Sequence, residues 1–147
     1  MKTILAAIDF SDVTEHLVEV ARDMARAHGV PLYLLHVEES EPDFVGYEPG
    51  PQHVRDQVAH DAVRHFKEEN SLRDQLRAEG IDAHSMVLQG PFVEKVLAEA
   101  ARLSADLIVV GSHGHGAVYN LLLGSVTEGI IKGAKCPVLV VPAPKKA

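Results

Sequence analysis

The sequence predicts an α/β fold: a three-layer, doubly wound domain built on a five-stranded parallel sheet. Apolar, strand-like runs alternate with amphipathic helical patterns along the 147 residues, and this alternation is typical of a parallel sheet with helical crossovers. Most of the strand-like runs are apolar at nearly every position, as expected of strands covered by helices on both faces. The length and the absence of a dividing linker or repeat predict a single domain over residues 1–147.

The elements are expected in regular order. The strands should cover residues 3–9, 31–37, 82–88, 105–110 and 137–141, and the helices 13–28, 53–79, the segment that begins at Pro91, and 125–134. The third strand is the least apolar, so we expect it near an edge of the sheet. Asp12 with Glu15, and Ser125 with Glu128, have the spacing of capping boxes at helix starts. Gly29 suits the position just after the first helix.

The two longest helices have apolar positions at helical spacing, and these positions should face the core. They are Val13, Leu17, Val20, Met24 and Ala27 in the first helix, and Val54, Val58, Ala62, Phe66, Leu72 and Leu76 in the second. Residues 38–52 form an acidic connection rich in proline and glycine. Its length leaves two interpretations open, a solvated connection or a lid over a neighbouring site.

Composition excludes several classes of function. The net charge of −7 gives nucleic acids and anionic membranes no electrostatic attraction, and the apolar runs are too short to span a membrane. Cys136 is the only cysteine, which excludes an internal disulfide, fits a cytoplasmic location and indicates a small buried side chain.

A glycine-rich stretch after the fourth strand is the strongest functional signal. It reads V-G-S-H-G-H-G-A-V-Y-N-L-L-L-G-S-V over residues 110–126. Gly111 and Gly114 let a ligand approach the main chain closely. The helix that follows Gly124-Ser125 presents unpaired N–H groups with partial positive charge. A glycine turn after a strand, close to a helix start, is an arrangement that holds phosphate.

Two common phosphate motifs are absent. A Walker loop has Lys after its glycines, whereas no Lys or Arg lies between Gly111 and Ser125. A dinucleotide fingerprint has glycines in the first strand-to-helix turn, which here reads D-F-S-D-V-T. The spacing that is present, Gly111, Gly114 and then Gly124-Ser125, resembles the ATP-binding motif of the universal stress protein family.

This resemblance covers nearly the whole chain, in I-L-A-A-I-D-F-S-D, L-L-H-V, D-L-I-V-V-G-S-H-G, L-L-L-G-S-V-T and A-K-C-P-V-L-V-V. It implies a Rossmann-like, adenine nucleotide α-hydrolase-like fold with strand order 3-2-1-4-5. It also implies binding of ATP, or of ADP or AMP, together with Mg²⁺ or Mn²⁺. A further implication is a homodimer formed by pairing of the last strands, Pro137–Val141.

The resemblance also implies roles for individual residues. Val37 matches the residue whose backbone recognises adenine, and Gly124, Ser125 and Val126 match the phosphate-holding segment. The remaining matched positions are Ala7 and Asp9 in the first-strand segment and Val110, Gly111 and Gly114 in the fourth-strand turn. Many family members have Arg or Lys where this chain has His115. Phosphate charge should then be met by backbone N–H groups, the helix dipole, a metal ion, and His113 or His115 in protonated form.

Two candidate residues have alternative explanations. Asp9 ends a central strand beside the expected phosphate site, where its carboxylate could contact the nucleotide or a Mg²⁺ ion. Alternatively, it caps the start of the first helical region. Ser125 could cap its helix, contact phosphate, or do the first without ligand and the second with it.

The nine histidines do not indicate a zinc site. His60 and His65 are five residues apart and share a helix face poorly, and neither a second cysteine nor an H-E-x-x-H pattern is present. Solvated or loop histidines are the expected alternative.

We therefore expect an adenine nucleotide-binding regulatory protein, a dimeric switch in a stress response with a protein partner that the sequence does not identify. Two alternatives remain: a slow ATPase, and a module for AMP or a cyclic nucleotide. No catalytic residue is assigned, because no general base, arginine finger or second carboxylate marks the glycine loop.

Overall fold

The computed structural model describes residues 1–38, 52–113 and 123–143. Within these ranges strands and helices alternate as predicted. The elements are β1 (Ile4–Ile8), α1 (Thr14–His28), β2 (Leu32–Glu38), α2 (Gln52–Ala78), β3 (Ala83–Gln89), α3 (Phe92–Arg102), β4 (Leu107–Gly111), α4 (Ser125–Gly133) and β5 (Val138–Val141). The expected lid or solvated connection lies outside the described residues, apart from its first residue, Glu38, and its last, Gln52.

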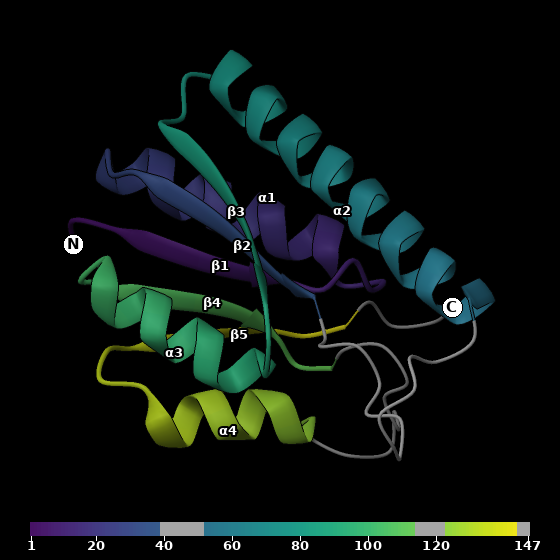
Figure 1. Cartoon of the computed structure of the whole chain (residues 1–147). Helices are drawn as coiled ribbons and strands as arrows, with labels where there is room; N and C mark the ends of the chain where they lie inside the picture. The colour runs from purple at the N-terminus through teal and green to yellow at the C-terminus, as the bar shows by residue number, and fades with distance from the viewer. Residues whose placement is uncertain (39–51, 114–122, 144–147) are drawn as a thin grey trace.

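The five strands form one parallel sheet in the order β3-β2-β1-β4-β5 (Figure 1). This confirms the strand order implied by the family resemblance and the edge position predicted for the third strand. The chain builds outward from β1 to β3 and then crosses back to place β4 on the other side of β1. The strand order therefore reverses between β1 and β4, and ligands of doubly wound sheets bind at such a switch point.

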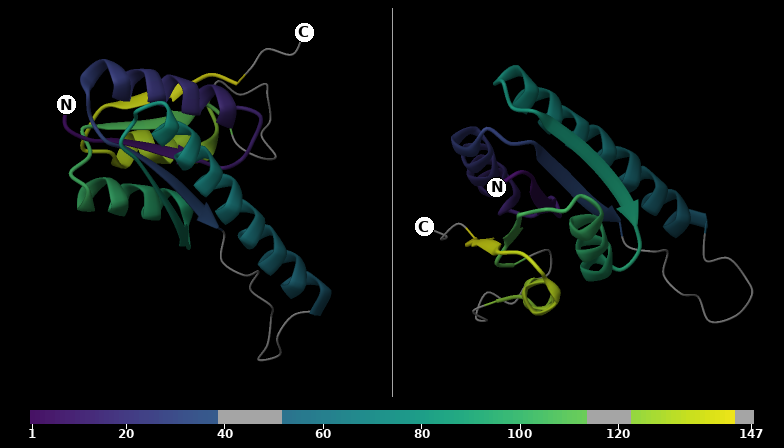
Figure 2. Two further views of the ribbon diagram at one scale, coloured as in Figure 1. Left: turned by 90° about the horizontal axis from the view of Figure 1, so that it is seen from above. Right: turned by 90° about the vertical axis from the view of Figure 1, so that its left-hand side faces the viewer.

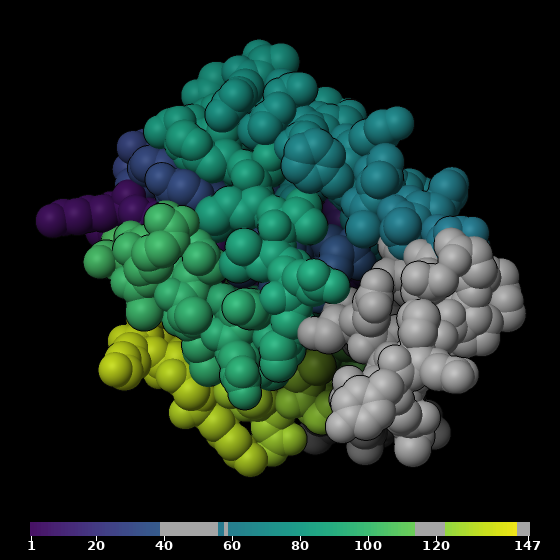
Figure 3. Space-filling model, in the orientation of Figure 1, coloured from purple at the N-terminus to yellow at the C-terminus, as the bar shows by residue number. Residues whose placement is uncertain are grey.

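Helices cover both faces of the sheet, which is the middle of three layers (Figure 2). One core cluster lies between the sheet and helices α1 and α2, and it contains Ile4, Ala6 and Ile8 of β1. The other lies under α3 and α4 and contains Leu5 and Ala7. Figure 3 shows the second face, where the surfaces of α3 and α4 adjoin. Alternate residues of the central strand thus reach opposite cores, as the pleat requires.

The buried faces of the two long helices differ from the predicted ones. In α1, Val20 and Met24 are only half-buried and Ala27 is exposed, because the helix contacts the sheet through a stripe that includes the small residues Ala21 and Ala25. In α2, Phe66 is 54% exposed.

The reason for the error in α2 is that polar side chains occupy its inward stripe. His65 is largely buried, Glu69 is fully buried, and Leu76 continues the same stripe. The apolar residues of α2 therefore do not mark its buried face, and the prediction based on them was wrong for Phe66. The side chains of Val54 and Val58 are outside the described part of the structure.

The predicted capping boxes are wrong, whereas the glycine C-cap is confirmed. The structure places the N-caps of α1 and α4 at Val13 and Gly124 instead of Asp12 and Ser125, and neither N-cap residue makes a side-chain capping hydrogen bond. Gly29 ends α1 in the left-handed conformation, with φ of 63°, which only glycine adopts without strain. Pro91 is the N-cap residue of α3 and lies just before its first turn.

Two further expectations concern exposure to solvent or lipid. Cys136 is partly exposed, not buried as predicted, although the remaining burial raises the pKa of its thiol. Within the described ranges, no helix has the length and apolar character needed to cross a membrane.

Candidate functional site

Asp9 and Gly111, two residues of the predicted site, lie at the switch point, where β1 and β4 end. Ile4 pairs with Leu107 and Ala6 pairs with Val109, so the two strands run in register toward the same edge of the sheet. Asp9 follows β1 at this edge, and β4 ends at Gly111. The fold therefore brings together two residues that are far apart in the sequence.

Gly111 is needed for packing at this edge. A Cβ atom placed on Gly111 would lie 2.5 Å from Cγ1 of Val13 and 3.3 Å from the carbonyl oxygen of His113. Val13 belongs to the turn between β1 and α1, so the absence of a side chain lets that turn lie directly against β4. Ligand approach is thus not the only reason for glycine at this position.

A hydrogen-bonded junction joins the end of β4 to the start of α4. The N–H of Gly124 donates to the carbonyl oxygen of Ser112 at 2.8 Å, and Thr127 Oγ1 donates to the carbonyl oxygen of Gly111 at 2.6 Å. Ser112 is also tied to the end of β5: its N–H donates to the carbonyl oxygen of Val141 at 2.8 Å. We call Gly111, Ser112, Gly124 and Thr127 the β4–α4 junction.

Ser112 and Thr127 were missed by sequence reasoning, because neither has a residue type or spacing that sets it apart before the fold is known. The buried Thr127 is within reach of Gly111 only after α4 has returned to the end of β4. A useful signal would have been threonine in the first turn of a helix that follows a glycine loop.

Removing the Thr127 hydroxyl should loosen the β4–α4 junction. A Thr127→Val variant keeps the side-chain shape but loses the donor to Gly111, and an unmade buried hydrogen bond costs about 1–3 kcal/mol. We expect urea unfolding to show a loss of stability in that range. Thr127→Ser retains the hydroxyl and should remain within about 1 kcal/mol of the wild type. Equal stability of the valine variant and the wild type would contradict the assigned role.

The start of α4 is accessible for a ligand. Ser125 is exposed and Val126 is 45% exposed, and Gly124 precedes them with extended backbone angles, φ −71° and ψ 155°. Because Gly124 is the N-cap residue, Ser125 is the first residue inside the helix. Glycine, which has no side chain to cap with, therefore occupies the N-cap position, and this argues against the capping explanation for Ser125.

Ala7, Val37 and Val110 have buried side chains that belong to the same core cluster, on the side of the sheet covered by α3 and α4. Their side chains are therefore committed to packing, and only their backbone groups could contact a ligand. The family resemblance implies such a backbone role for Val37.

The carboxylate of Asp9 has a local partner. Its Oδ1 accepts a hydrogen bond from the N–H of Ser11 at 3.0 Å, in the turn between β1 and α1. This contact agrees with the alternative in which Asp9 stabilises the approach to the first helix, but it uses only one of the two carboxylate oxygens. The Asp9 side chain is partly exposed and remains accessible to a cation.

Of the two candidate histidines, His113 is partly buried at the end of β4, where its Nδ1 lies 3.0 Å from Oγ of Ser112. Gly114 and His115 lie outside the described residues. The structure thus groups Asp9, Gly111, Gly124 and Ser125 around the switch point.

The parallel sheet, its switch point and the β4–α4 junction define a Rossmann-like α/β domain. Within this class, the model for the "Universal stress protein family" matches residues 1–142. A universal stress protein encoded in the 3′ region of a sulfhydrylase gene of Thermus aquaticus is 38% identical, over 95% of this chain and 98% of its own length. The chain therefore belongs to the universal stress protein family.

Solved structures agree with this assignment. The universal stress protein UspA from Lactobacillus plantarum has a TM-score of 0.83 at 19% identity, over 95% of this chain and 97% of its own. A universal stress protein from Archaeoglobus fulgidus in complex with dAMP has a TM-score of 0.67 at 23% identity, over 95% and 97%. Another universal stress protein, in complex with cAMP, has a TM-score of 0.71 at 22% identity, over 97% and 98%. At these identities the structures establish a shared fold.

Proposed function

We propose that this chain is an adenine nucleotide-binding universal stress protein that acts as a dimeric switch, with ATP as the favoured ligand. The β4–α4 junction is the observation that supports this most. It fixes the start of α4 beside the end of β4 by the bond from Gly124 N–H to Ser112, only 2.8 Å long, while Ser125 and Val126 stay accessible. The first N–H groups of a helix have no partner within it and attract anions.

Phosphate at this position would be neutralised mainly by backbone groups. No Lys or Arg occurs between Gly111 and Ser125, so this segment would offer phosphate the N–H groups at the start of α4 and the helix dipole. Mg²⁺ or Mn²⁺ held between the phosphates and Asp9 would supply the remainder, since both ions prefer carboxylate and phosphate oxygens. His113 and His115 would add charge in protonated form.

The choice of adenine rests on the family and on two structural neighbours. One of these universal stress proteins binds dAMP and the other binds cAMP, and both ligands contain adenine. In this chain the backbone of Val37, at the end of β2, would recognise the base. Mass spectrometry of the ligand retained after purification tests the proposal. ATP or ADP supports it, AMP or a cyclic nucleotide supports the second binding alternative, and a non-adenine ligand contradicts both.

An enzyme is the competing class. A slow ATPase would use the same site, but Asp9 is the only carboxylate that the described residues place at the end of β1 or β4, and a phosphoryl-transfer site uses several charged groups. Turnover above roughly 1 per second, the low end of ordinary enzyme rates, would establish the enzyme. We expect ATP turnover well below that rate. We also expect the protein to be located in the cytoplasm.

Asp9→Asn tests the metal role. The amide keeps an oxygen that can accept from Ser11 but loses the charge that attracts Mg²⁺. We expect ATP affinity in the presence of Mg²⁺ to fall about tenfold, the loss of one charge-assisted interaction. Binding of AMP with chelator present should change little. Calorimetric titration measures both, and an equal loss for the two ligands would assign Asp9 to the nucleotide itself or to folding.

Pairing of β5 between two copies is the proposed route to the dimer, and β5 is an edge strand. The carbonyl oxygens of Pro137 and Val141 accept from the N–H groups of Ile108 in β4 and of Ser112, the residue that follows β4. Because backbone groups alternate along a strand, those of Val138 and Val140 point outward, toward the free edge.

Val140→Pro should therefore block dimerisation. Proline removes the outward N–H of Val140, and edge strands tolerate it because the inner hydrogen bonds remain. We expect light scattering after size-exclusion chromatography to report a monomer for the variant and a dimer for the wild type. A variant that stays dimeric, or a monomeric wild type, would contradict pairing through β5.

A further inference from the structure

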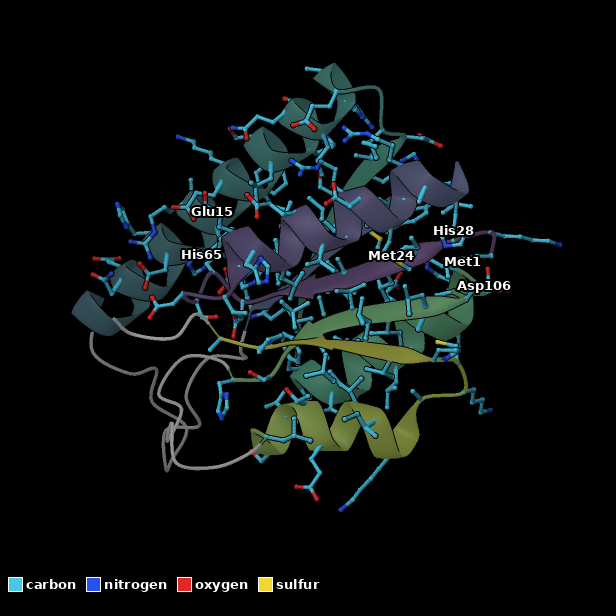
Figure 4. All side chains as sticks on the ribbon, turned by 180° about the vertical axis from the view of Figure 1, so that it is seen from behind. Met1, Glu15, Met24, His28, His65 and Asp106 are labelled. Atoms are coloured by element: carbon cyan, nitrogen blue, oxygen red, sulfur yellow. The ribbon has the colours of Figure 1, made fainter. Side chains whose placement is uncertain are left out.

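A second cluster of polar side chains lies at the end of β2, on the face opposite the Val37 side chain. His36 and Glu38 come from β2, and His65 comes from α2. Nε2 of His36 is 3.0 Å from Oε1 of Glu38, and Nδ1 of His65 is 2.5 Å from the same oxygen. We call these three residues the His-Glu-His cluster. Figure 4 labels His65 on α2 and Glu15 near the start of α1, both at the opposite end of the sheet from Met1 and Asp106.

The prediction that the histidines are solvated is wrong for His65. Its side chain is 16% exposed, and its ring stacks on Phe10 with a centroid separation of 4.8 Å and an interplanar angle of 9°. The His36 side chain is 5% exposed and meets Phe10 edge to face, also at 4.8 Å. Phe10 has a positive φ of 58°, and in this conformation its ring packs against both imidazoles. Both rings are therefore held in place.

The hydrogen bonds of His36 determine which of its nitrogen atoms can bind a cation. Nδ1 is 2.9 Å from the carbonyl oxygen of Ile8, which can only accept, so Nδ1 carries a proton. A neutral imidazole has its lone pair on the other nitrogen, and that nitrogen, Nε2, faces Glu38. Metal-binding histidines usually donate the remaining N–H to a backbone carbonyl or carboxylate in this way.

The lone pair of His36 faces a carboxylate oxygen. Nδ1 of His36 already donates to Ile8, and its Nε2 lies 3.0 Å from Oε1 of Glu38. A shared proton or a cation between these two atoms accounts for so short a contact. Two imidazoles and one carboxylate form a ligand set that suits Zn²⁺.

The spacing of the three atoms fits one ion. The ligand atoms all lie within 4.8 Å of one another, and two atoms bound to one tetrahedral Zn²⁺ are about 3.3 Å apart. Small side-chain rotations would therefore bring all three into contact with a shared ion. The positive charge of Arg64 is close to the cluster, with its Nη2 atom 3.5 Å from Nε2 of His65. The carboxylates of Asp61 and Glu68, 3.7 and 3.9 Å from the Arg64 guanidinium, balance this charge.

A groove that adjoins Phe10, the residue packed on both histidines, carries an excess of acidic side chains. The groove has a volume of about 660 Å³, lies between α1 and α2 and includes Phe10 in its lining. Five carboxylates and one arginine line the same groove: Asp12, Glu15, Glu19, Glu68, Glu79 and Arg22. Acidic residues in a recess raise the local concentration of cations.

We propose that His36, Glu38 and His65 form a binding site for Zn²⁺ or a similar transition-metal dication, separate from the nucleotide site at the switch point. The ion binds Nε2 of His36, a carboxylate oxygen of Glu38 and Nδ1 of His65, and water completes its coordination. Because the ligands come from β2 and α2, the ion cross-links the long helix to the end of the sheet. Binding therefore stabilises the folded chain.

Calorimetric titration of ZnCl₂ into full-length, tag-free and nucleotide-free protein tests the site. We expect one high-affinity equivalent of Zn²⁺ per chain and a higher melting temperature with Zn²⁺ than with chelator. His65→Ala and Glu38→Gln should each weaken binding at least tenfold. Glu38→Gln preserves the size of the side chain and so remains informative if the alanine variant folds poorly. Cobalt substitution should give the visible absorption of tetrahedral Co²⁺, and both variants should lose it.

A control variant separates this site from others. His60→Ala removes an exposed histidine from the same helix and should leave Zn²⁺ binding unchanged. The proposal is overturned if no equivalent of Zn²⁺ binds, in which case shared protons hold the cluster. It is also overturned if His65→Ala and Glu38→Gln bind Zn²⁺ as the wild type does.

Discussion

Replacing Ser125 with proline should weaken adenine nucleotide binding about tenfold or more. Ser125 is the first residue of α4, and its N–H belongs to the group of donors that a helix start offers to phosphate. Proline removes that donor together with the hydroxyl. A hydrogen bond to a charged group contributes about 1.5–3 kcal/mol, and 1.4 kcal/mol corresponds to a tenfold change in affinity.

The fold should tolerate this substitution. Proline is favoured at the first position of a helix, and the residue before it must be extended. Gly124 has φ −71° and ψ 155° and already meets this requirement. Ser125→Ala is the matched control, because it removes the hydroxyl and leaves the N–H in place. We expect the alanine variant to bind several times more tightly than the proline variant in parallel titrations. Wild-type affinity in a folded Ser125→Pro protein would refute the assignment of phosphate to the start of α4.

Replacing Glu69 should change how stability depends on pH. Glu69 is fully buried on α2, and neither carboxylate oxygen makes a hydrogen bond among the described residues. Burial raises the pKa of Glu69 from about 4.5 to about 8, an effect only partly offset by backbone groups of Met86 and His36 and by the charge of Arg73. The folded protein therefore retains a proton that the unfolded chain has released at neutral pH.

The direction in which stability changes with pH follows from this difference in bound protons. Between about pH 4.5 and about pH 8 the folded state binds more protons than the unfolded state, so stability falls as pH rises and levels off above that range. The full pKa shift of Glu69 corresponds to a loss of at most about 5 kcal/mol in the free energy of unfolding. Glu69→Gln is neutral throughout, so we expect it to be more stable than the wild type by about 2 kcal/mol at pH 8, with a smaller difference at pH 5. Its buried amide lacks partners and reduces the gain.

Urea unfolding at the two pH values measures this effect, with chelator present to keep the His-Glu-His cluster free of metal. Glu68→Gln is the matched control, because Glu68 is the neighbouring residue on α2 and its side chain is 48% exposed. Glu68→Gln should have the same free energy of unfolding as the wild type at both pH 5 and pH 8. The assignment of a protonated, buried Glu69 is wrong if Glu69→Gln and the wild type lose the same stability between pH 5 and pH 8.

The fold could be predicted from the sequence because burial on both faces of a parallel sheet leaves a direct pattern. Runs such as residues 107–110 are apolar throughout, and Gly29 indicates a helix end that the structure confirms. The sequence also predicted that Gly111 lies at the ligand-binding edge of the sheet. A turn directly after a parallel strand lies at the carboxyl ends of the strands, where doubly wound domains bind their ligands.

Contacts between distant segments could not be predicted in the same way. The bond from Thr127 to Gly111 and the contact of Val13 with Gly111 exist only after the elements have packed. The polar residues His65 and Glu69 face inward on α2, opposite to the rule that polar residues face solvent. Phe66 was consequently assigned to the wrong face, and the His-Glu-His cluster was not expected.

Calorimetric titration of nucleotide-free protein with ATP in the presence of Mg²⁺ tests the central proposal most directly, with GTP as the parallel ligand. We expect one ATP site per chain and loss of affinity in Ser125→Pro. GTP should bind at least tenfold more weakly, since the proposal assigns recognition of adenine to the backbone of Val37. No measurable binding of ATP, or equal binding of ATP and GTP, would contradict the proposal that this universal stress protein senses adenine nucleotides.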